Sequence, residues 1–286
     1  MAATTATTPR PTKRSIPWTV LPFAAILVAL LLIAILAPLV APMDPNTQNL
    51  LARLKAPGFQ ARGMTYFLGS DELGRDVLSR LIYGARVSLL VAFASVTLSG
   101  IFGTVVGMIA AFYRGWTETL IMRLVDIVLS VPAILLAIIT VAVLGPSFAN
   151  VVIVLSMTRW PRYARVAYGQ TLSVANMPYV RLSRFMGAGW LRLLSRHILP
   201  NIAGALIVVA TLEFGLMVLF EAGLSFLGLG VQPPTASWGA MLATGRNYVA
   251  TAWWIATFPG LALFLLVLSI NLIGDHIRDR LDPRGR

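Results

Sequence analysis

The sequence predicts an all-α integral membrane protein with six transmembrane helices, and three observations support this fold class. First, 57% of the 286 residues are hydrophobic and only 12% are charged, whereas soluble domains carry about 25% charged residues. Second, the chain contains uncharged runs as long as the roughly 20 residues that cross a bilayer. Third, arginines gather in alternate connections between those runs, as expected of a multi-pass membrane protein. Soluble enzyme classes are therefore poor candidates.

The first predicted span covers residues 17–41 and follows a basic cytoplasmic tail, residues 1–16. No charged residue occurs from Ser15 to Pro42. A cleaved signal peptide is the alternative, because basic residues precede the run and small residues end it. Signal-peptide apolar regions are only about 7–15 residues long, and this run is longer. We therefore expect an uncleaved membrane anchor.

The remaining five spans form the predicted core, residues 86–275. Uncharged windows place them at Val87–Tyr113, Ile127–Thr158 and Asn247–Gly274. The middle window is too long for one span, and Gly145-Pro146 predicts a tight turn that divides it into two helices. Ile202–Leu227 is counted as a further span because its aliphatic content matches the others.

Arginine distribution predicts the orientation. Seven arginines occur from Arg159 to Arg196 without an acidic residue, whereas the connection before the last span holds only Arg246. The positive-inside rule then places both termini and a connecting loop at about 168–200 in the cytoplasm, with residues 276–286 as the C-terminal tail. This topology explains the net charge of +12 without a nucleic-acid partner.

The external connection, residues 42–85, contains a predicted amphipathic helix. In Leu68–Leu89, Ser70 and Asp71 are candidate N-caps, and apolar residues recur at helical spacing. Two acid–base pairs four residues apart have the acid on the N-terminal side, which favours a helix. The helix is either a solvated lead into the second span or part of an external gate or receptor-docking surface. Candidate residues for the second role are Asp71, Arg75, Asp76 and Arg80.

Two acids interrupt the fifth span and are candidates for a translocation path. Glu213 lies near its middle, where a charge costs roughly 2.5–3.5 kcal/mol on insertion scales, so we expect it to face protein or water. A hydrogen-bonded or protonated group between helices is the alternative. Glu221 lies nearer the external end, where a structural role is favoured, with Arg75, Arg80 or Arg86 as its expected partner.

Small residues predict close packing of the second span. Gly100, Gly103 and Gly107 fall on one helical face, and the last two form a GxxxG pattern. Small side chains at such positions let two helix backbones approach each other.

The cytoplasmic loop contains a second predicted short helix. Pro178 can begin it, and Gly187 and Gly189 can end it. Basic residues alternate there with apolar ones such as Leu182 and Phe185. An exposed apolar side suits insertion into a groove of another protein. The alternative is a helix lying on the membrane, with its arginines on anionic lipid.

The sequence contains no catalytic motif. A phosphate-binding P-loop needs Gly-Lys followed by Ser or Thr, but Lys13 and Lys55 follow Thr12 and Leu54. There are no cysteines and two histidines, so neither a thiolate nor a metal site is expected. We predict no catalytic residue, metal or cofactor in this chain.

Three segments together resemble the DppC/OppC type of permease subunit in ABC importers for dipeptides, oligopeptides and nickel. They are LGSDELGRDVLSRLIYGARVSL at 68–89, YVRLSRFMGAGWLRLLSRHILPN at 179–201 and EAGLSFLGLGVQPPTASWGAML at 221–242. The resemblance extends over nearly the whole chain beyond the N-terminal tail. It implies a type I ABC importer permease fold in a bacterial plasma (inner) membrane.

The middle segment resembles the EAA motif, whose coupling helix docks on the ATPase subunit. The family triplet Glu-Ala-Ala would fall on Arg181, Leu182 and Ser183, so the usual glutamate is replaced, whereas Gly187 and Ile198-Leu199-Pro200 are retained. The ATPase-coupling residues implied by the resemblance are Tyr179, Arg181, Leu182, Ser183, Arg184, Phe185, Met186 and Gly187.

The resemblance also implies the partners and the mechanism. A complete importer would hold a second permease chain, two ATPase subunits that bind ATP and Mg, and an extracytoplasmic substrate-binding protein. Alternating access would move a peptide, with a nickel chelate or glutathione as alternative cargoes. A self-sufficient secondary transporter is the rival class, disfavoured because the sequence shows neither an inverted repeat nor a filter motif.

Overall fold

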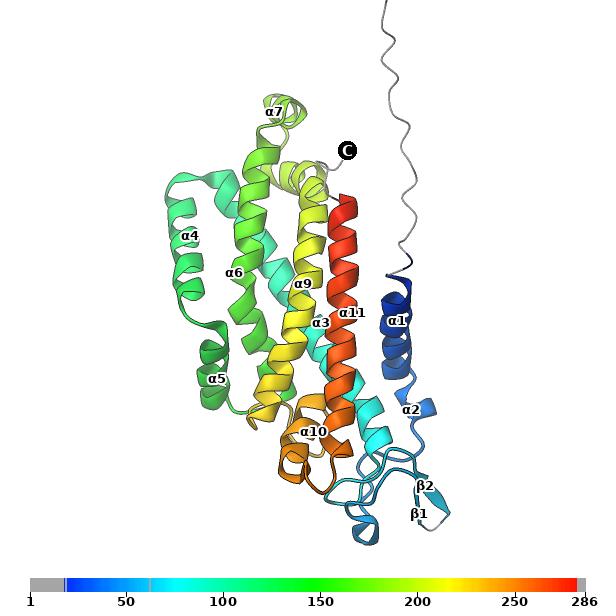
Figure 1. The fold of residues 1–286 in the computed structure, drawn as a ribbon. Helices are drawn as coiled ribbons and strands as arrows, with labels where there is room; N and C mark the ends of the chain where they lie inside the picture. Colours follow the sequence, from blue (N-terminus) through cyan, green and yellow to red (C-terminus); the bar gives the residue numbers. More distant parts are fainter. Residues whose placement is uncertain (1–17, 19, 62, 282–286) are drawn as a thin grey trace, which may run out of the picture.

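The computed structural model describes residues 18, 20–61 and 63–281, and most of them are helical (Figure 1). The principal helices are α1 Leu21–Ile35, α2 Ala37–Val40, α3 Val77–Tyr113, α4 Gly115–Ser130, α5 Ala133–Leu144, α6 Phe148–Ala175, α7 Pro178–Phe185, α8 Trp190–Arg192, α9 Leu199–Phe226, α10 Trp238–Gly245 and α11 Trp254–Leu281. Short helical turns occur at Leu50–Ala52, Leu193–Ile198 and Arg246–Tyr248. Strands β1 Phe59–Ala61 and β2 Met64–Tyr66 form an antiparallel hairpin, with Phe59 opposite Tyr66.

The long helices run back and forth between two ends of a bundle (Figure 1). We call them the α7 end, where α11 also finishes, and the α10 end, which carries the hairpin. In chain order α1, α3, the α4–α5 pair, α6, α9 and α11 alternate in direction (Figure 1). This alternation is what the six predicted spans require.

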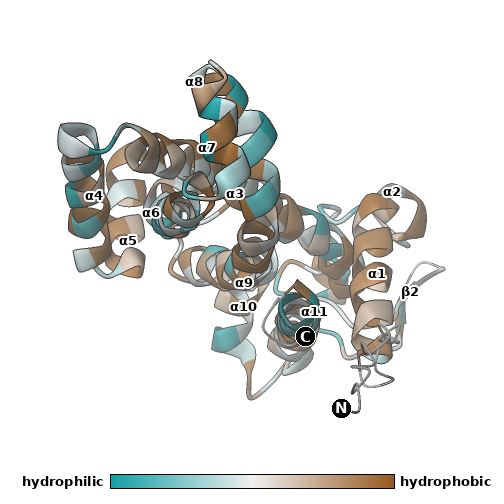
Figure 2. Ribbon diagram, turned by 90° about the horizontal axis from the view of Figure 1, so that it is seen from above, coloured by the Kyte–Doolittle hydropathy of each residue, from teal (hydrophilic) through white to brown (hydrophobic). Residues whose placement is uncertain are grey.

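Length and hydropathy distinguish the described helices. Val77–Tyr113, Trp190–Phe226 and Trp254–Leu281 are each long and apolar enough to cross a membrane. The α4–α5 pair meets the same test only when its two helices are joined, and they bend by 90°. Viewed from the α7 end, hydrophobic residues cover much of α1 and α5, while hydrophilic residues gather on α4 and α7 (Figure 2).

The bend between α4 and α5 corrects the prediction of one straight helix before the turn at Gly145-Pro146. Val131 is extended, with φ −94° and ψ 132°, and α5 starts after Pro132. Proline disfavours helical geometry in the preceding residue and has no N–H to donate. The turn itself is confirmed, because α5 ends at Leu144 and Gly145 adopts φ +85°.

The predicted amphipathic helix at 68–89 does not form as a separate element. Instead α3 begins at Val77 and continues for 37 residues. Its N-cap is Asp76, whose carboxylate accepts from the Ser79 backbone N–H, so the expected caps Ser70 and Asp71 are wrong. A continuous helix is favoured because no proline separates Val77 from the predicted second span, and the single glycine between them, Gly84, is accommodated within α3.

Two predicted boundaries shift because helices continue past the apolar windows. Helix α6 extends to Ala175, so Arg159, Arg162 and Arg165 lie inside it rather than in the cytoplasmic loop. Helix α11 extends to Leu281, beyond the predicted start of the C-terminal tail at 276. The predicted N-terminal tail lies outside the described residues.

The predicted glycine face packs α3 against α6. A β-carbon on Gly103 would lie 2.3 Å from the Trp160 carbonyl oxygen, and one on Gly107 would lie 2.3 Å from that of Ala164. The backbones therefore approach too closely for a larger side chain, which confirms the packing role.

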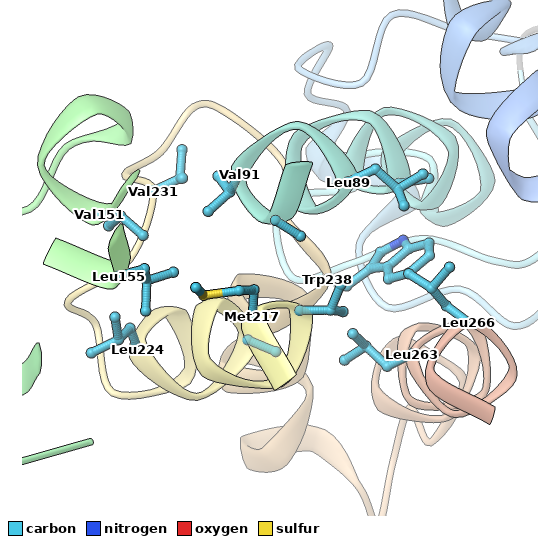
Figure 3. Packing of buried hydrophobic residues seen from close by; sticks show 14 of the residues in the cluster. Leu89, Val91, Val151, Leu155, Met217, Leu224, Val231, Trp238, Leu263 and Leu266 are labelled. Carbon is cyan, nitrogen blue, oxygen red and sulfur yellow. The ribbon is translucent and has the colours of Figure 1, made fainter. Parts of the chain in front are cut away.

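Around the α10 end, Trp238 fills the core between three helices. Its indole lies between Leu89 of α3 and Leu263 and Leu266 of α11 (Figure 3). The indole N–H donates to the Leu81 carbonyl at 2.9 Å. Helix α10 is thereby fixed to the spans although it crosses no membrane itself.

Candidate functional site

Helix α7 begins and ends where the sequence predicts. Pro178 occupies its first turn, and Gly187, just past its end, adopts φ +85°, a conformation that glycine takes without strain. The side chains of Phe185, Met186 and Leu182 are 88%, 80% and 61% exposed. Helix α7 lies at the tip of the α7 end (Figure 1), where these apolar side chains stay open.

Polar side chains of α7 hold it to its own chain. Ser183 Oγ lies 3.3 Å from His197 Nε2. Arg181 donates to the Asn176 side-chain oxygen at 2.9 Å. The Arg184 guanidinium lies 5.7 Å from the centre of the Phe112 ring, within cation–π range. These contacts orient the helix while its apolar side stays uncovered.

Tyr179 and Val180 pack against the segment that leads into α9. The Tyr179 ring packs edge-on against His197, with ring centres 6.3 Å apart. Val180, the next residue, is buried in a small apolar cluster with Leu193 and Ile198. This cluster joins α7 to the start of α9 through Ile202, which belongs to the same cluster.

A group of charges lies in the middle of the bundle, around Glu213. Arg162 donates to one carboxylate oxygen at 3.1 Å, and Arg159 lies 3.7 Å from the other. The Arg159 guanidinium also lies 4.1 Å from the centre of the Phe220 ring. Glu213 therefore faces protein, as expected, and its partners come from α6.

Sequence reasoning missed these partners because it ended the fourth span at Thr158. The spacing of Arg159, Arg162 and Arg165 at intervals of three is a signal that could have found them, since it fits one helical face. Two further contacts join α6 to α4, an ion pair between Arg165 and Asp126 and a hydrogen bond from the Tyr168 hydroxyl to Glu118.

Glu221 is fully buried near the α10 end of α9. It accepts from Ser88 Oγ at 2.8 Å and from Ser225 Oγ at 2.7 Å. Ser237, the N-cap of α10, donates to Ser225 at 3.3 Å. The expected pairing with Arg75, Arg80 or Arg86 is wrong, because neutral hydroxyls on α3 and α9 take that place.

The segment before α3 buries its charges. Asp71 pairs with Arg75 at 2.6 Å, as predicted, and with Arg80 at 3.5 Å. The predicted pair of Asp76 with Arg80 is wrong, because Asp76 caps α3 and Arg80 turns to Asp71 and the Pro45 carbonyl. A gate or receptor-docking role for these four residues stays a prediction.

Burial raises the pKa of two carboxyl groups in the segment before α3. Desolvation raises the pKa of Glu72 above its ordinary value, and the neighbouring Asp71 carboxylate raises it further. Desolvation likewise raises the pKa of Asp76, although hydrogen bonds from Ser79 oppose the shift. Both shifts follow from moving a charge out of water.

Metal ligands do not gather anywhere in the described part of the chain. No group of three or more His, Asp or Glu side chains is placed to hold an ion there. A cavity of about 800 Å³ is a cleft between α1, α3, α9 and α11 lined almost wholly by apolar side chains.

Comparison with protein families matches two parts of the chain. Residues 103–286 match the family described as "Binding-protein-dependent transport system inner membrane component". Residues 23–57 match the "N-terminal TM domain of oligopeptide transport permease C". The two matches agree with the resemblance to the DppC/OppC type.

Curated relatives cover most of the chain. The di/tripeptide transport system permease protein DppC of Pseudomonas aeruginosa is 49% identical over 88% of this chain and 83% of its own length. The dipeptide transport system permease protein DppC of Escherichia coli is 46% identical over 90% and 86%. The probable D,D-dipeptide transport system permease protein DdpC of the same organism is 41% identical over 92% and 86%.

Solved structures support the fold. The chain aligns with the inward-facing MetNI methionine ABC transporter at a TM-score of 0.56 and 20% identity, over 71% of this chain and 96% of the other. An amino acid ABC transporter aligns at a TM-score of 0.53 and 14% identity, over 70% and 94%. At such identities the likeness concerns the fold alone. The family matches and the curated relatives show that this chain belongs to the inner membrane components of binding-protein-dependent transport systems, as an ABC importer permease of the DppC/OppC type.

Proposed function

We propose that this chain is one of two permease chains of an ATP-driven importer of dipeptides or oligopeptides. The names of its relatives support the cargo, since those from Pseudomonas aeruginosa and Escherichia coli are named as peptide transport permeases. Nickel chelates and glutathione are the alternative cargoes within the same family. The substrate-binding protein would select among them outside the membrane.

The single observation that carries the coupling proposal is the uncovered apolar side of α7. Phe185 and Met186 are among the most exposed large hydrophobic side chains of the described residues. Soluble surfaces seldom expose such a patch unless it meets a partner. We assign the groove that receives it to an ATPase subunit, and the coupling set to Tyr179, Arg181, Leu182, Ser183, Arg184, Phe185, Met186 and Gly187.

Force would pass from the ATPase subunits to the spans through contacts already described. Closure of two ATPase subunits around ATP and Mg moves α7. The cluster of Val180, Leu193 and Ile198 transmits the movement to α9, which carries Glu213. The two permease chains then rock about each other and open the path alternately to the two sides, releasing a peptide delivered by the binding protein.

ATP hydrolysis belongs to the partners in this scheme. The purified chain alone is expected neither to bind nor to hydrolyse ATP, because both lysines lack a phosphate-binding context. Specific hydrolysis by the isolated, contaminant-free chain would contradict its assignment as a transport subunit without an ATPase site.

Topology follows from the arginine distribution, which places the α7 end and both termini in the cytoplasm. The chain has no cysteine, so single-cysteine variants report cleanly. Thr235→Cys, on an exposed residue of the α10 end, should react with an impermeant thiol reagent added outside intact cells. Ser173→Cys, exposed near α7, should be protected. The reverse pattern would overturn the topology.

Reconstitution tests the whole proposal. Proteoliposomes should contain the second permease chain and the ATPase subunits, with the binding protein added on the side of the α10 end. Radiolabelled dipeptides should accumulate only when ATP is present on the side of α7. Uptake of glutathione or a nickel chelate in place of peptides would leave the importer proposal intact and change only the substrate. ATP-independent uptake by this chain alone would favour a secondary transporter.

A further inference from the structure

The side chain of Arg162 is 53% exposed, whereas that of its partner Glu213 is 2% exposed. Both residues lie midway along their 28-residue helices, α6 and α9. A charge facing hydrocarbon at such depth is costly, so ionisable groups inside spans face protein or water. The side of α6 that exposes Arg162 therefore does not face lipid.

The polar character continues along α6. The ion-paired side chains of Arg165 and Asp126 are also half exposed, and Gly169 and Gln170 are exposed further towards α7. We call these five residues the α6 stripe, namely Arg162, Arg165, Gly169, Gln170 and the α4 residue Asp126. A row of this kind is suited to water or to a polar solute.

The opposite side of the bundle has a different chemistry. The 800 Å³ cleft between α1, α3, α9 and α11 is lined by side chains such as Leu27, Phe93 and Ile207. Arg86 borders a smaller cavity on that side, but it lies near the start of α3, from which a long side chain reaches the headgroup layer. Lipid-facing character thus belongs to the cleft side, and the α6 stripe faces elsewhere.

Charge at the centre is not balanced. Arg159 and Arg162 bring two positive charges to the single carboxylate of Glu213. Within the described residues, the side chain of Arg162 donates one hydrogen bond, to Glu213, out of its five N–H donors. The buried Nε of Arg159 has no hydrogen-bond partner there. A guanidinium with free donors binds a carboxylate in a two-point geometry.

We propose that the α6 stripe lines the water-filled path and that Arg162 binds the carboxylate of the substrate as it passes. The carboxylate assignment rests on the proposed function, because a peptide ends in that group. Glu213 holds Arg162 in place and competes for it, so the bound state is short-lived. Transport sites need such balance, since binding must permit both entry and release.

Thiol labelling tests the path independently of cargo. This chain has no native cysteine, so labelling of the chain itself in the assembled importer reports one position. Arg162→Cys should react at least tenfold faster with a charged, water-soluble thiol reagent than Ile207→Cys, which lies in the apolar cleft. Equal and slow labelling at both positions would overturn the inference. Loss of the second permease chain from the Arg162→Cys complex would assign the stripe to a chain interface instead.

Uptake tests the carboxylate contact. Arg162→Gln should lower the ratio of dipeptide uptake to uptake of its C-terminal amide about tenfold below the wild-type ratio. The binding protein is the same with both permease chains, so its preference cancels when the two ratios are compared. Arg162→Lys should restore part of the ratio, and Arg86→Gln on the cleft side should leave it unchanged. An unchanged ratio in Arg162→Gln would overturn the carboxylate contact while leaving the proposed function intact.

Failure of the proposed function has a separate signature. The wild-type importer would then carry neither the dipeptide nor its amide, whatever the variants do. The labelling rates at positions 162 and 207 decide the path assignment in that case as well, since they require no substrate.

Discussion

The segment before α3 and the segment around α7 differ in what they bury. Both combine arginines with apolar residues beside the end of a span, and the sequence predicts a helix in each. At 68–80, the charged Asp71 and Arg80 are only 3% and 6% exposed and contact each other. At 178–187, the apolar Phe185 is 88% exposed.

We interpret this difference as that between a set of ion pairs that stabilises the chain itself and, under the proposed function, a surface that binds another chain. Buried ions are stable only with partners in good geometry, and the segment at 68–80 supplies those partners itself. An exposed apolar patch gains free energy only when something covers it. Substitutions at 68–80 should therefore damage the chain, and substitutions at 178–187 should damage the complex.

Asp71→Leu should have the largest effect. It leaves Arg75 and Arg80 buried without their shared carboxylate, and removing one partner of a buried ion pair costs about 3–5 kcal/mol of stability. Thermal unfolding of the purified chain in detergent measures the loss. Asp44→Ala, on an exposed residue of the same connection, is the control and should change little. Equal unfolding temperatures of Asp71→Leu and wild type would show that the Asp71 ion pairs do not stabilise the chain.

Glu221→Leu should come next. It deprives the hydroxyls of Ser88 and Ser225 of their acceptor, and each unsatisfied buried group costs about 1–3 kcal/mol. Glu221→Gln keeps an acceptor of the same shape and should lose less. If the two variants unfold alike, the hydrogen bonds between α3 and α9 are not what makes this acid matter.

Phe185→Ala should weaken association and spare the chain. Binding energy concentrates in a few large anchors, so we expect a loss on the order of 1–2 kcal/mol or more in affinity for the ATPase subunit. Surface substitutions usually change stability by within about 0.5 kcal/mol. Titration of the ATPase subunit and thermal unfolding are the paired measurements. If Phe185→Ala lowers the unfolding temperature but binds the ATPase subunit normally, the two segments do not differ in the way described.

Arg181→Ala should have the smallest effect. Its side chain makes one exposed hydrogen bond, to Asn176, and such contacts contribute about 0.5–1.5 kcal/mol at most. The loss of affinity for the ATPase subunit should be below that of Phe185→Ala. A larger loss would reveal a matching acid on the partner, at the position where the family usually carries glutamate.

Local chemistry explains why much of the fold was predictable. Pro178 and Gly187 bound α7, and Gly145 marks a turn, because these residues restrict or extend the backbone choices of their own position. Gly103 and Gly107 marked the α3–α6 contact for a similar reason. The break at Pro132 carried the same kind of signal and was overlooked.

The candidate site was less predictable because its contacts are distant in sequence. Arg162 and Glu213 are 51 residues apart, and the charge rule assigns arginines to loops. The prediction therefore ended the fourth span at Thr158, before Arg159 and Arg162. Glu221 shows the same limit, since its acceptor role depends on Ser88, 133 residues away.

Crosslinking from position 185 tests the central claim, that the apolar side of α7 is where ATPase subunits drive this permease. Phe185→Cys in the reconstituted importer, treated with a short thiol-to-amine crosslinker, should form a product with an ATPase subunit and lose ATP-dependent peptide uptake in proportion. Phe67→Cys, an exposed residue of the opposite end, should form no such product. The account is contradicted if Phe185→Cys yields no ATPase product and Gly187→Val and Phe185→Ala both retain full assembly and uptake. In that case α7 lies on lipid.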